Sequence, residues 1–487
     1  MMIDKQTSGG PVVAVLGGGF AGAATAYHLA RALPSREARI VVVEPRPVLG
    51  RGLAYGSDDP AHRINVPAAK MSLIPDEPGH FVSWLTAEGI RMSPGTLTLS
   101  GDCFPERRIF GQYVAAQLGR FVASGVIRHR RAAAIRVARR DDGYDIDLSN
   151  GATFAADLVV LAMSHPAPRV PWALRGLTGS RRLIADPYDN ARVAAIARSD
   201  RVLVVGSGLA SADAVASLDR RGFHGHVTVL SRHGLRSRGH GTVVAPSPAD
   251  FARPPERTAV GILGRVRAAV AADAMRGQSW HAALDRVREQ GDAIWSALDP
   301  VERSRLARHL RRFWDVHRFR VAPQVEAVLA RLNAAGRLDF AAARLIDATE
   351  EQEGVLARYR PRHATETLSA RFDTVVIATG PDHAEAIPSS PVLRALAAGG
   401  LIEPDPLGLG LRVAGRCRAV ARDGTASETL YVAGPLARGD VGELMGVPEV
   451  ARHAERLAGL LAQRLTSLET PEATRSRRET RLSLWKQ

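Results

Sequence analysis

Short runs of consecutive apolar residues, without polar alternation, recur along the chain. Such runs are typical of strands that are buried on both faces of a sheet. Two of them lead directly into glycine-rich turns and then into alanine-rich helical stretches: residues 12–16 precede the turn at 17–22, and residues 202–205 precede the turn at 206–211. The pattern therefore predicts the order strand, turn and helix, and it predicts this order twice.

A second pattern follows each of these units. Short strands flanked by polar residues occur at 132–161 and 345–365, and each set ends in another apolar run, at 158–162 and 374–378. This succession predicts a β-meander that closes on a buried return strand. The two halves together predict an α/β protein with two Rossmann-like dinucleotide-binding domains.

The remaining segments complete the expected domain organisation. Residues 279–332 have helical periodicity, 236–255 are a connecting loop, and 428–435 are a further buried strand before a helix that runs from Pro448 to about Leu465. We expect a discontinuous first domain at 1–170 and 375–469, and a second domain at 171–374 with a helical insertion at about 251–335. The tail at 470–487 is charged, and we expect it to be flexible.

The first glycine-rich turn has the residues that a bound pyrophosphate requires. Gly17 allows the tight turn, Gly19 lets the phosphate approach the backbone, and Gly22 lets the helix pack close to the strand. A second buried strand ends in Glu44, about 20 residues after the turn, where a carboxylate accepts hydrogen bonds from a ribose. The expected cofactor contacts of this domain are Gly17, Gly19, Phe20, Ala21, Gly22, Glu44 and Gly434.

The second turn differs at two informative positions. Ser211 replaces the third glycine, and the next strand ends in Ser231 and Arg232 where the first unit has a carboxylate. A hydroxyl and a guanidinium suit a 2′-phosphate, because arginine offers a fork of donors to phosphate oxygens. We therefore expect NADPH in preference to NADH at a site formed by Gly206, Gly208, Leu209, Ala210, Ser211, Ser231 and Arg232.

Composition narrows the class of protein. The chain has 487 residues, and its only two cysteines, Cys103 and Cys417, are far apart, which predicts neither disulfides, a redox dithiol nor a metal site. The net charge of +15 comes from scattered arginines, so we expect no nucleic-acid partner but an attraction for small anions. Since no apolar run is long enough to span a membrane, the expected location is the cytoplasm.

These motifs resemble the two-dinucleotide-domain flavoproteins, which share the arrangement of glutathione reductase. Within them the chain is similar to the bacterial FAD/NAD(P)-binding family that includes flavin-dependent urate hydroxylases and L-aspartate N-monooxygenases. The resemblance spans about residues 12–465 and rests on 17–22, 52–55, 64–67, 71–72, 81–85, 108–113, 205–211, 231–234, 314–318 and 433–448. Two positions depart from the pattern of these proteins, Ser164-His165 and Pro435.

The resemblance implies an FAD-dependent NAD(P)H monooxygenase that uses O2 as a cosubstrate. The specific expectation is urate hydroxylation to 5-hydroxyisourate, and the alternatives are N-hydroxylation of an amino acid such as L-aspartate, or a flavoprotein redox sensor or partner-binding module. Candidate contacts for an anionic substrate are Asn65, Lys70 and Arg107. The flavin would carry the chemistry, so no catalytic acid or base is assigned, and the oligomeric state stays open.

Overall fold

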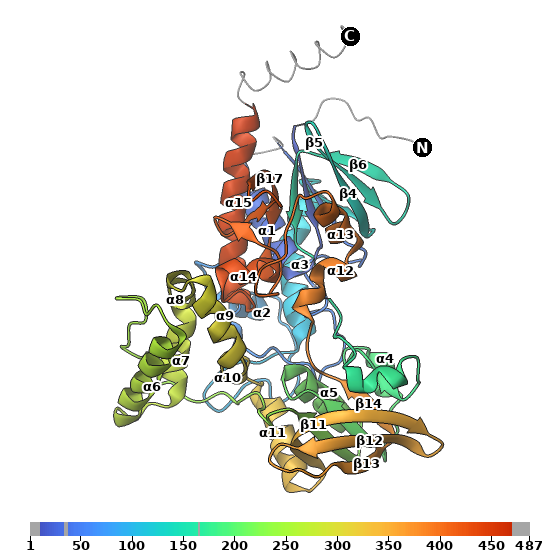
Figure 1. Cartoon of the computed structure of the whole chain (residues 1–487). Helices are drawn as coiled ribbons and strands as arrows, with labels where there is room; N and C mark the ends of the chain where they lie inside the picture. The colour runs from blue at the N-terminus through green and yellow to red at the C-terminus, as the bar shows by residue number, and fades with distance from the viewer. Residues whose placement is uncertain (1–9, 34–37, 164–165, 470–487) are drawn as a thin grey trace.

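The computed structural model describes residues 10–33, 38–163 and 166–469 of the chain, and Figure 1 shows their arrangement. The tail expected at 470–487 and the positions Ser164 and His165 lie outside the described residues. Two seven-stranded sheets, each with its own helices, form the upper and lower halves of this view, and a group of helices lies to one side.

The first sheet contains the first glycine-rich turn. Its strands, in spatial order, are β15 (Val413–Ala414), β16 (Arg418–Val420), β17 (Ala426–Val432), β7 (Leu158–Leu161), β1 (Val12–Leu16), β2 (Arg39–Val43) and β3 (Ile127–Arg130). The five strands from β17 to β3 are parallel, whereas β15 and β16 are antiparallel. The predicted apolar runs thus form the centre of this sheet.

Both faces of β1 are covered, which explains why its sequence does not alternate. Val13 and Val15 belong to a core cluster that includes the helix residues Tyr27 and Leu457. Ala14 and Leu16 belong to a second cluster on the opposite face of the sheet, together with residues of the first meander. Each strand residue is therefore buried whichever way it points.

The second sheet repeats this plan. In spatial order its strands are β13 (Leu368–Phe372), β12 (Gly354–Pro361), β11 (Leu338–Glu351), β10 (His226–Ser231), β9 (Arg201–Val205), β14 (Thr374–Ile377) and β8 (Leu183–Ile184). The strands from β11 to β8 are parallel. The prediction of a duplicated α/β architecture with two Rossmann-like domains is confirmed.

The two meanders are built differently. The first forms a separate antiparallel sheet of β4 (Ala134–Arg140), β5 (Gly143–Leu148) and β6 (Thr153–Ala156). In the second, β11 first pairs with β10 in parallel and then, from Ala343 onward, with β12 in antiparallel orientation. One long strand thus belongs to both the parallel sheet and the meander, where the sequence predicted only short strands from residue 345.

Helices cover both sheets. Around the first sheet they are α1 (Phe20–Ala32), α2 (His80–Ala87), α3 (Arg107–Ala123), α12 (Ala386–Ser389), α13 (Pro391–Ala398), α14 (Arg438–Val441) and α15 (Val447–Glu469), with short 3-10 turns η1 (Ala68–Lys70), η3 (His383–Glu385) and η4 (Gly434–Ala437). The second domain has α4 (Asn190–Ala194), α5 (Leu209–Arg220), α11 (Pro323–Ala334) and η2 (Trp172–Leu177). Helix α15 packs along α1, and α11 packs against α5. None of the described helices has both the length and the apolar character that crossing a membrane requires.

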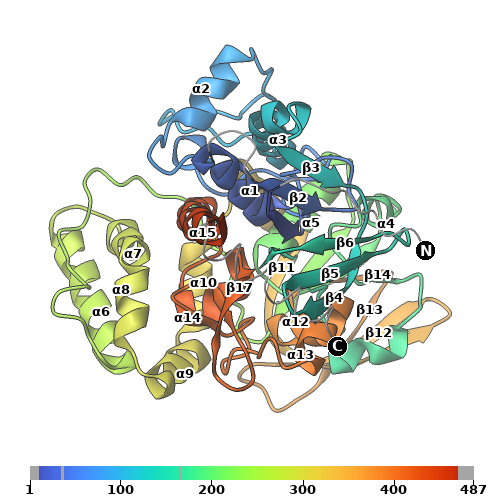
Figure 2. The same cartoon turned by 90° about the horizontal axis from the view of Figure 1, so that it is seen from above.

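The insertion is a helical subdomain with a small core of its own. It consists of α6 (Ala259–Met275), α7 (Trp280–Glu289), α8 (Gly291–Ala297), α9 (Pro300–His309) and α10 (Arg311–Arg318), and Figure 2 shows it beside α14 and α15. The predicted range of about 251–335 also contained α11. That helix packs on α5 and β11, so it is the crossover between β10 and β11 of the second sheet.

The chain crosses between the domains twice. Strand β14 pairs along its whole length with β9, so it belongs to the second sheet. The expected boundary between residues 374 and 375 therefore falls inside this strand, and the return to the first domain comes after Ile377. Helix α13 already packs on β4 of the first meander.

Candidate functional site

The first glycine-rich turn has no room for side chains at two positions. Gly17 has φ +108°, and a Cβ there would collide with the carbonyl oxygen of Ala162 in the return strand. A Cβ on Gly22 would collide with the carbonyl oxygen of Gly17. Helix α1 begins at Phe20 after Gly19, and no side chain caps its N-terminus. The free backbone N–H groups of this first turn fit a pyrophosphate.

Glu44 lies at the end of β2 beside this turn and is 5 % exposed. Its Oε2 accepts a hydrogen bond from the backbone N–H of Gly18 at 2.9 Å, and its Oε1 accepts one from the backbone N–H of Arg46 at 3.0 Å. The guanidinium of Arg46 also lies 3.4 Å from Oε1, so Oε2 is the oxygen that can accept a further bond. This fixed carboxylate therefore fits the ribose hydroxyls of an FAD adenosine.

Gly434 brings the C-terminal part of the chain onto the same turn. It follows β17 with φ +68°, and a Cβ there would lie 2.6 Å from the Cβ of Ala21 in the first turn of α1. The described residues around the first turn thus form a cradle that fits FAD, and the individual contacts expected for Gly17, Gly19, Phe20, Ala21, Gly22, Glu44 and Gly434 stay predictions.

The second turn reproduces the geometry of the first. Gly206 has φ +116°, and a Cβ there would collide with the carbonyl oxygen of Ala378, as Gly17 does with Ala162. The backbone N–H of Gly206 donates to Leu230 O at 2.9 Å, matching the bond from Gly17 to Val43 O at 2.9 Å. Helix α5 begins at Leu209 and Ala210 after Gly208, without a side-chain cap.

Ser211 occupies the position of the third glycine without disturbing the turn. It is buried, and its Oγ donates to Gly208 O at 2.8 Å. The helix therefore keeps its close approach to β9, and the site fits a second dinucleotide.

A cationic cluster surrounds the end of β10. Ser231 Oγ accepts a hydrogen bond from the backbone N–H of Gly234, and Arg232 is exposed. A guanidinium nitrogen of Arg312 lies 3.0 Å from Nε2 of His233. Partial burial lowers the pKa of His233, and the nearby cations Arg312, Arg362 and Arg232 lower it further. The coenzyme-binding end of the second domain is thus cationic, with Arg312 supplied by the insertion.

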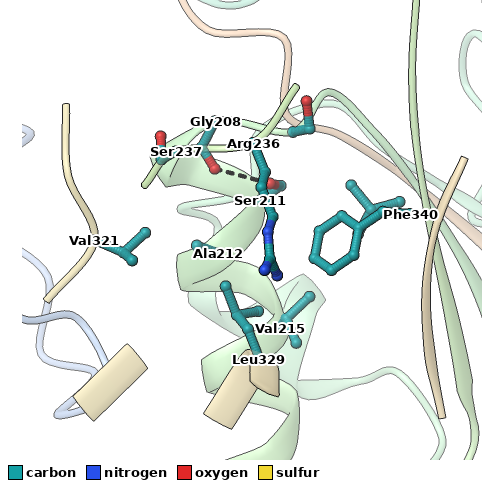
Figure 3. Close-up of a pocket in the computed structure, with 11 residues that line it drawn as sticks. Gly208, Ser211, Ala212, Val215, Arg236, Ser237, Val321, Leu329 and Phe340 are labelled. Atoms are coloured by element: carbon teal, nitrogen blue, oxygen red, sulfur yellow. Dashed lines mark hydrogen bonds between the residues drawn. The ribbon is translucent and has the colours of Figure 1, made fainter. Parts of the chain in front are cut away.

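A pocket lies in the second domain between α5, α11 and the sheet, immediately beside the second turn. Figure 3 shows the side chain of Arg236 descending into it between Ser211 and Phe340. The guanidinium carbon of Arg236 is 4.9 Å from the centre of the Phe340 ring. The lining residues are Ser207, Gly208, Ser211, Ala212, Val215, Val229, Arg236, Ser237, Val321, Leu329 and Phe340.

The three candidate substrate residues differ in what they contact. Asn65 is half-buried, and its carbonyl oxygen lies 3.1 Å from His240 Nε2. Lys70 ends η1, is exposed and has no ion-pair partner among the described residues. Arg107 is buried, with its guanidinium 2.8 Å from a carboxylate oxygen of Asp213 on α5. This engagement indicates a structural role for Arg107 instead of the expected substrate contact.

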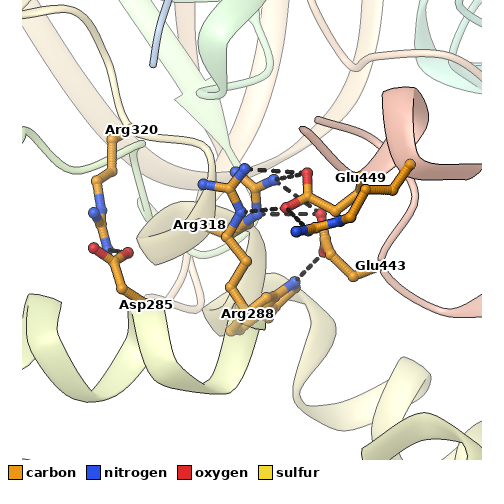
Figure 4. Close-up of polar contacts among 8 residues, drawn as sticks. Asp285, Arg288, Arg318, Arg320, Glu443 and Glu449 are labelled. Carbon is orange, nitrogen blue, oxygen red and sulfur yellow. Dashed lines mark hydrogen bonds and ion pairs between the residues drawn. The ribbon is translucent and has the colours of Figure 1, made fainter. Parts of the chain in front are cut away.

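Buried ion pairs attach the insertion to the C-terminal segment of the first domain. As Figure 4 shows, Arg288 and Arg318 face the carboxylates of Glu443 and Glu449. Arg288 Nε donates to Glu449 Oε1 at 2.8 Å, and Arg318 is 3.0 Å from Glu443 and 3.3 Å from Glu449. Although burial alone would raise it, the two guanidinium groups lower the pKa of Glu449. Glu443 lies just before helix α15, and Glu449 lies in its first turn.

Neither cysteine forms a disulfide, and Cys417 is buried. Burial raises the pKa of the Cys417 thiol to about 11, which makes it a poor nucleophile at neutral pH. No group of metal-ligating side chains occurs in the described part of the chain.

Several polar residues of the site were not found from the sequence. Asp213 had a usable signal, because it is an acidic residue within an alanine- and serine-rich helix. Arg236 belongs to a short run of basic residues after β10, with Arg232 and Arg238. Arg312 and Glu449 had none, because their partners are far away in sequence.

Comparison with known proteins identifies the fold. Residues 14–166 match the model of a family described as FAD-NAD(P)-binding. No curated protein sequence matches the chain.

Solved structures match over nearly the whole length. Ornithine hydroxylase from Pseudomonas aeruginosa has a TM-score of 0.64 at 17 % identity, covering 94 % of this chain and 100 % of that protein. L-lysine 6-monooxygenase from Pseudomonas syringae has a TM-score of 0.63 at 19 % identity, with coverage of 94 % and 100 %. An ornithine N-hydroxylase from Kutzneria sp. 744, solved with reduced FAD, NADP+ and L-ornithine, has a TM-score of 0.61 at 17 % identity, with coverage of 95 % and 100 %.

At these identities the likeness establishes the fold, and the family match and the geometry of the first turn establish dinucleotide binding. The chain therefore carries an FAD-NAD(P)-binding domain at residues 14–166 and has the two-dinucleotide-domain fold of the ornithine and lysine hydroxylases.

Proposed function

We propose that this chain is an FAD-dependent monooxygenase that oxidises NADPH and hydroxylates the amino group of an amino acid or a small amine. The observation that carries the proposal is that nearly the whole chain has the fold of the ornithine and lysine enzymes. Both dinucleotide turns are present, and their glycines have no room for a side chain. Gly17–Gly22 with Glu44 would hold FAD, and Gly206–Ser211 with Arg232 would hold NADPH.

The reaction balances as substrate N–H, O2, NADPH and a proton giving substrate N–OH, water and NADP+. FAD, when bound, would supply the redox chemistry that couples NADPH oxidation to O2. The protein's contribution is to orient the two cofactors and to keep bulk water from the reacting centre.

Lys70 is the residue that supports an acidic or zwitterionic substrate. It is an exposed cation without an ion-pair partner among the described residues, in a segment between the first turn and α2. The carboxylate of a substrate could form an ion pair with the Lys70 ammonium group. Urate hydroxylation remains a second candidate on the same ground, because urate is also an anion. The amine substrates named for the matched structures favour N-hydroxylation.

The test is NADPH oxidation under air with L-ornithine, L-lysine, L-aspartate, cadaverine and urate. We expect one amine to stimulate oxidation and to gain one oxygen atom in proportion to the NADPH consumed. The Lys70→Met variant should raise KM for an amino acid about 10- to 100-fold, and leave KM for cadaverine unchanged, because cadaverine has no carboxylate.

Three results would redirect the proposal. Stimulation by urate alone, with a hydroxylated purine as product, would replace N-hydroxylation by the second candidate. Bound FAD that NADPH does not reduce would favour a redox sensor. Coupled turnover of cadaverine but of no amino acid would exclude the role assigned to Lys70.

A further inference from the structure

A buried ion pair joins the coenzyme-binding helix to the first domain. Asp213 lies on α5, one residue beyond the Ala212 that follows the second turn, and is 4 % exposed. Arg107 is the first residue of α3 in the first domain, and its guanidinium is 2.8 Å from Asp213 Oδ2. Both charges have been removed from water, so each depends on the other for compensation.

Further hydrogen bonds complete this pair. Tyr188 of the second domain donates its hydroxyl to Asp213 Oδ2 at 3.1 Å, and Arg107 Nε donates to Arg63 O at 2.9 Å. Burial, and then Asp213, raises the pKa of Tyr188 to about 12, so Tyr188 remains a donor at neutral pH. Burial opposes the charge of Arg107, but Asp213 outweighs this and raises the pKa of the guanidinium.

Neighbouring contacts extend the same network across the domain interface. His62 of the first domain is 1 % exposed, and its Nε2 lies 3.1 Å from Ser217 Oγ on α5. Its Nδ1 lies 2.6 Å from Ser57 Oγ, to which Asn190 of the second domain donates at 3.2 Å. These hydrogen bonds fix the position of one domain relative to the other. Apolar contacts alone would let the two domains slide.

The helix ends explain why the pair belongs to the interface. The N-terminus of a helix is its positive end, so an arginine in the first turn of α3 is unfavourable for that helix alone. Asp213 lies in the second turn of α5, beyond the reach of that helix's own dipole, and it compensates the charge of Arg107. Local helix formation therefore does not account for Arg107, and its contact with Asp213 does.

We infer that Arg107 and Asp213 are a positioning pair, which fixes the coenzyme turn of α5 relative to the first domain so that the coenzyme reaches the flavin. The inference rests on the proposed function. The first turn of α5 forms the phosphate site, and the second turn carries Asp213, so any rotation of α5 away from α3 displaces the coenzyme. Displacements of about 1 Å cost on the order of 100-fold in rate when two reactants must be aligned.

The test compares Asp213→Asn and Arg107→Met with a matched control on the same helix. Asp219 of α5 pairs at 2.7 Å with Arg331 of α11, entirely within the second domain, so Asp219→Asn removes an ion pair without touching the interface. The measurement is the anaerobic reduction of bound FAD by saturating NADPH in a single turnover. We expect at least a ~10-fold slower reduction in Asp213→Asn and a change below ~2-fold in Asp219→Asn, with equal FAD content.

If the pair only stabilises the fold, Asp213→Asn will have a lower melting temperature, but NADPH will reduce the FAD of the folded variant at the wild-type rate. That result would overturn the inference. Hydrogen exchange supplies a second readout that needs no coenzyme. In Asp213→Asn and Arg107→Met, peptides covering 57–63 and 186–194 should exchange faster, with both sheets unchanged.

The two readouts separate the failure of the positioning pair from the failure of the proposed function. If NADPH does not reduce the FAD bound to the wild-type protein, the proposed function is wrong. Hydrogen exchange in the two variants would still test whether Arg107 and Asp213 fix the domain interface. Unchanged exchange in both variants would overturn the positioning role.

Discussion

Gly434 is a single residue on which two distant parts of the first domain depend. It lies just after β17, in the left-handed region, and packs against the first turn of α1. A side chain there would meet both a conformational penalty and a collision with Ala21. Glycine is therefore required where the last strand completes a site begun by the first.

We expect Gly434→Ala to lose bound FAD during purification, because the new Cβ pushes α1 away from the sheet. Gly424→Ala is the matched control, since Gly424 also has positive φ (+84°) but its Cβ would meet nothing within 4 Å. The control should cost only the backbone penalty of about 1–2 kcal/mol. The measurement is the ratio of FAD to protein by absorbance. Equal ratios in Gly434→Ala and Gly424→Ala would contradict this reasoning.

Arg232 and Arg312 are expected to set the coenzyme preference. Replacing either with alanine should lower kcat/KM for NADPH about 10- to 100-fold, the value of one charge-assisted hydrogen bond to the 2′-phosphate. The value for NADH, which lacks this phosphate, should change little. Arg308→Ala, an exposed position on α9, is the control. An unchanged NADPH/NADH ratio in both variants would exclude the assigned roles.

At the scale of elements, the insertion depends on its buried ion pairs with the first domain. Glu449→Gln removes the carboxylate that pairs with both Arg288 and Arg318 and leaves only Arg318 paired, with Glu443; breaking such a buried pair costs about 3–5 kcal/mol. We expect α7 and α10 to exchange amide hydrogens faster, with the two sheets unaffected.

Glu289→Gln provides the comparison for this variant. Glu289 makes an exposed pair with Arg286 in α7, and exposed pairs contribute at most about 1 kcal/mol. Equal protection of α10 in the two variants, measured by mass spectrometry, would mean that apolar packing alone holds the insertion in place.

The sequence predicted the elements whose pattern is local. Continuous apolar runs identified β1, β2, β7, β9, β14 and β17, and the glycines located both turns. It did not predict that β11 joins the parallel and the antiparallel parts of the second sheet, because the change of partner at Ala343 depends on β10 and β12 together. It also included α11 in the insertion, because helical periodicity does not distinguish a crossover helix from its neighbours.

The candidate site was predicted in the same uneven way. Backbone contacts such as Gly17 and Gly206 follow from a motif, since the geometry requires glycine at those positions. Arg107 was expected to face a substrate, but Asp213, more than one hundred residues later in the chain, occupies its guanidinium. Partners of charged side chains depend on tertiary structure, and one sequence does not contain that information in readable form.

At the scale of the whole molecule, buried neutral histidines make stability depend on pH. Burial, and then Arg320, lowers the pKa of His240 to about 4, and burial also lowers the pKa of His28, His62, His281 and His453. Between about pH 6.5 and 4 the unfolded chain binds a proton at His240 that the folded chain does not, and the other four histidines act in the same direction. Their contribution is therefore complete above pH 6.5 and is lost as the pH falls through this window.

We expect His240→Gln to flatten this decline. Glutamine keeps a donor for Asn65 O but takes up no proton, so the loss of unfolding free energy between pH 7.5 and 4.5 should shrink by on the order of 3 kcal/mol. His224→Gln, at an exposed position, is the control. Denaturant titrations at the two pH values provide the measurement, and parallel declines in wild type and His240→Gln would contradict the assignment.

The double crossing of the chain has a consequence for biosynthesis. A ribosome completes every strand of the second sheet before it has made β17 and α15, which the first sheet and its flavin cradle require. The nascent first domain therefore waits with an open edge at β7 while the second domain folds beside it. Flavin capture becomes the closing step of synthesis, and cells short of riboflavin should accumulate chains whose coenzyme half is native and whose flavin half is degraded.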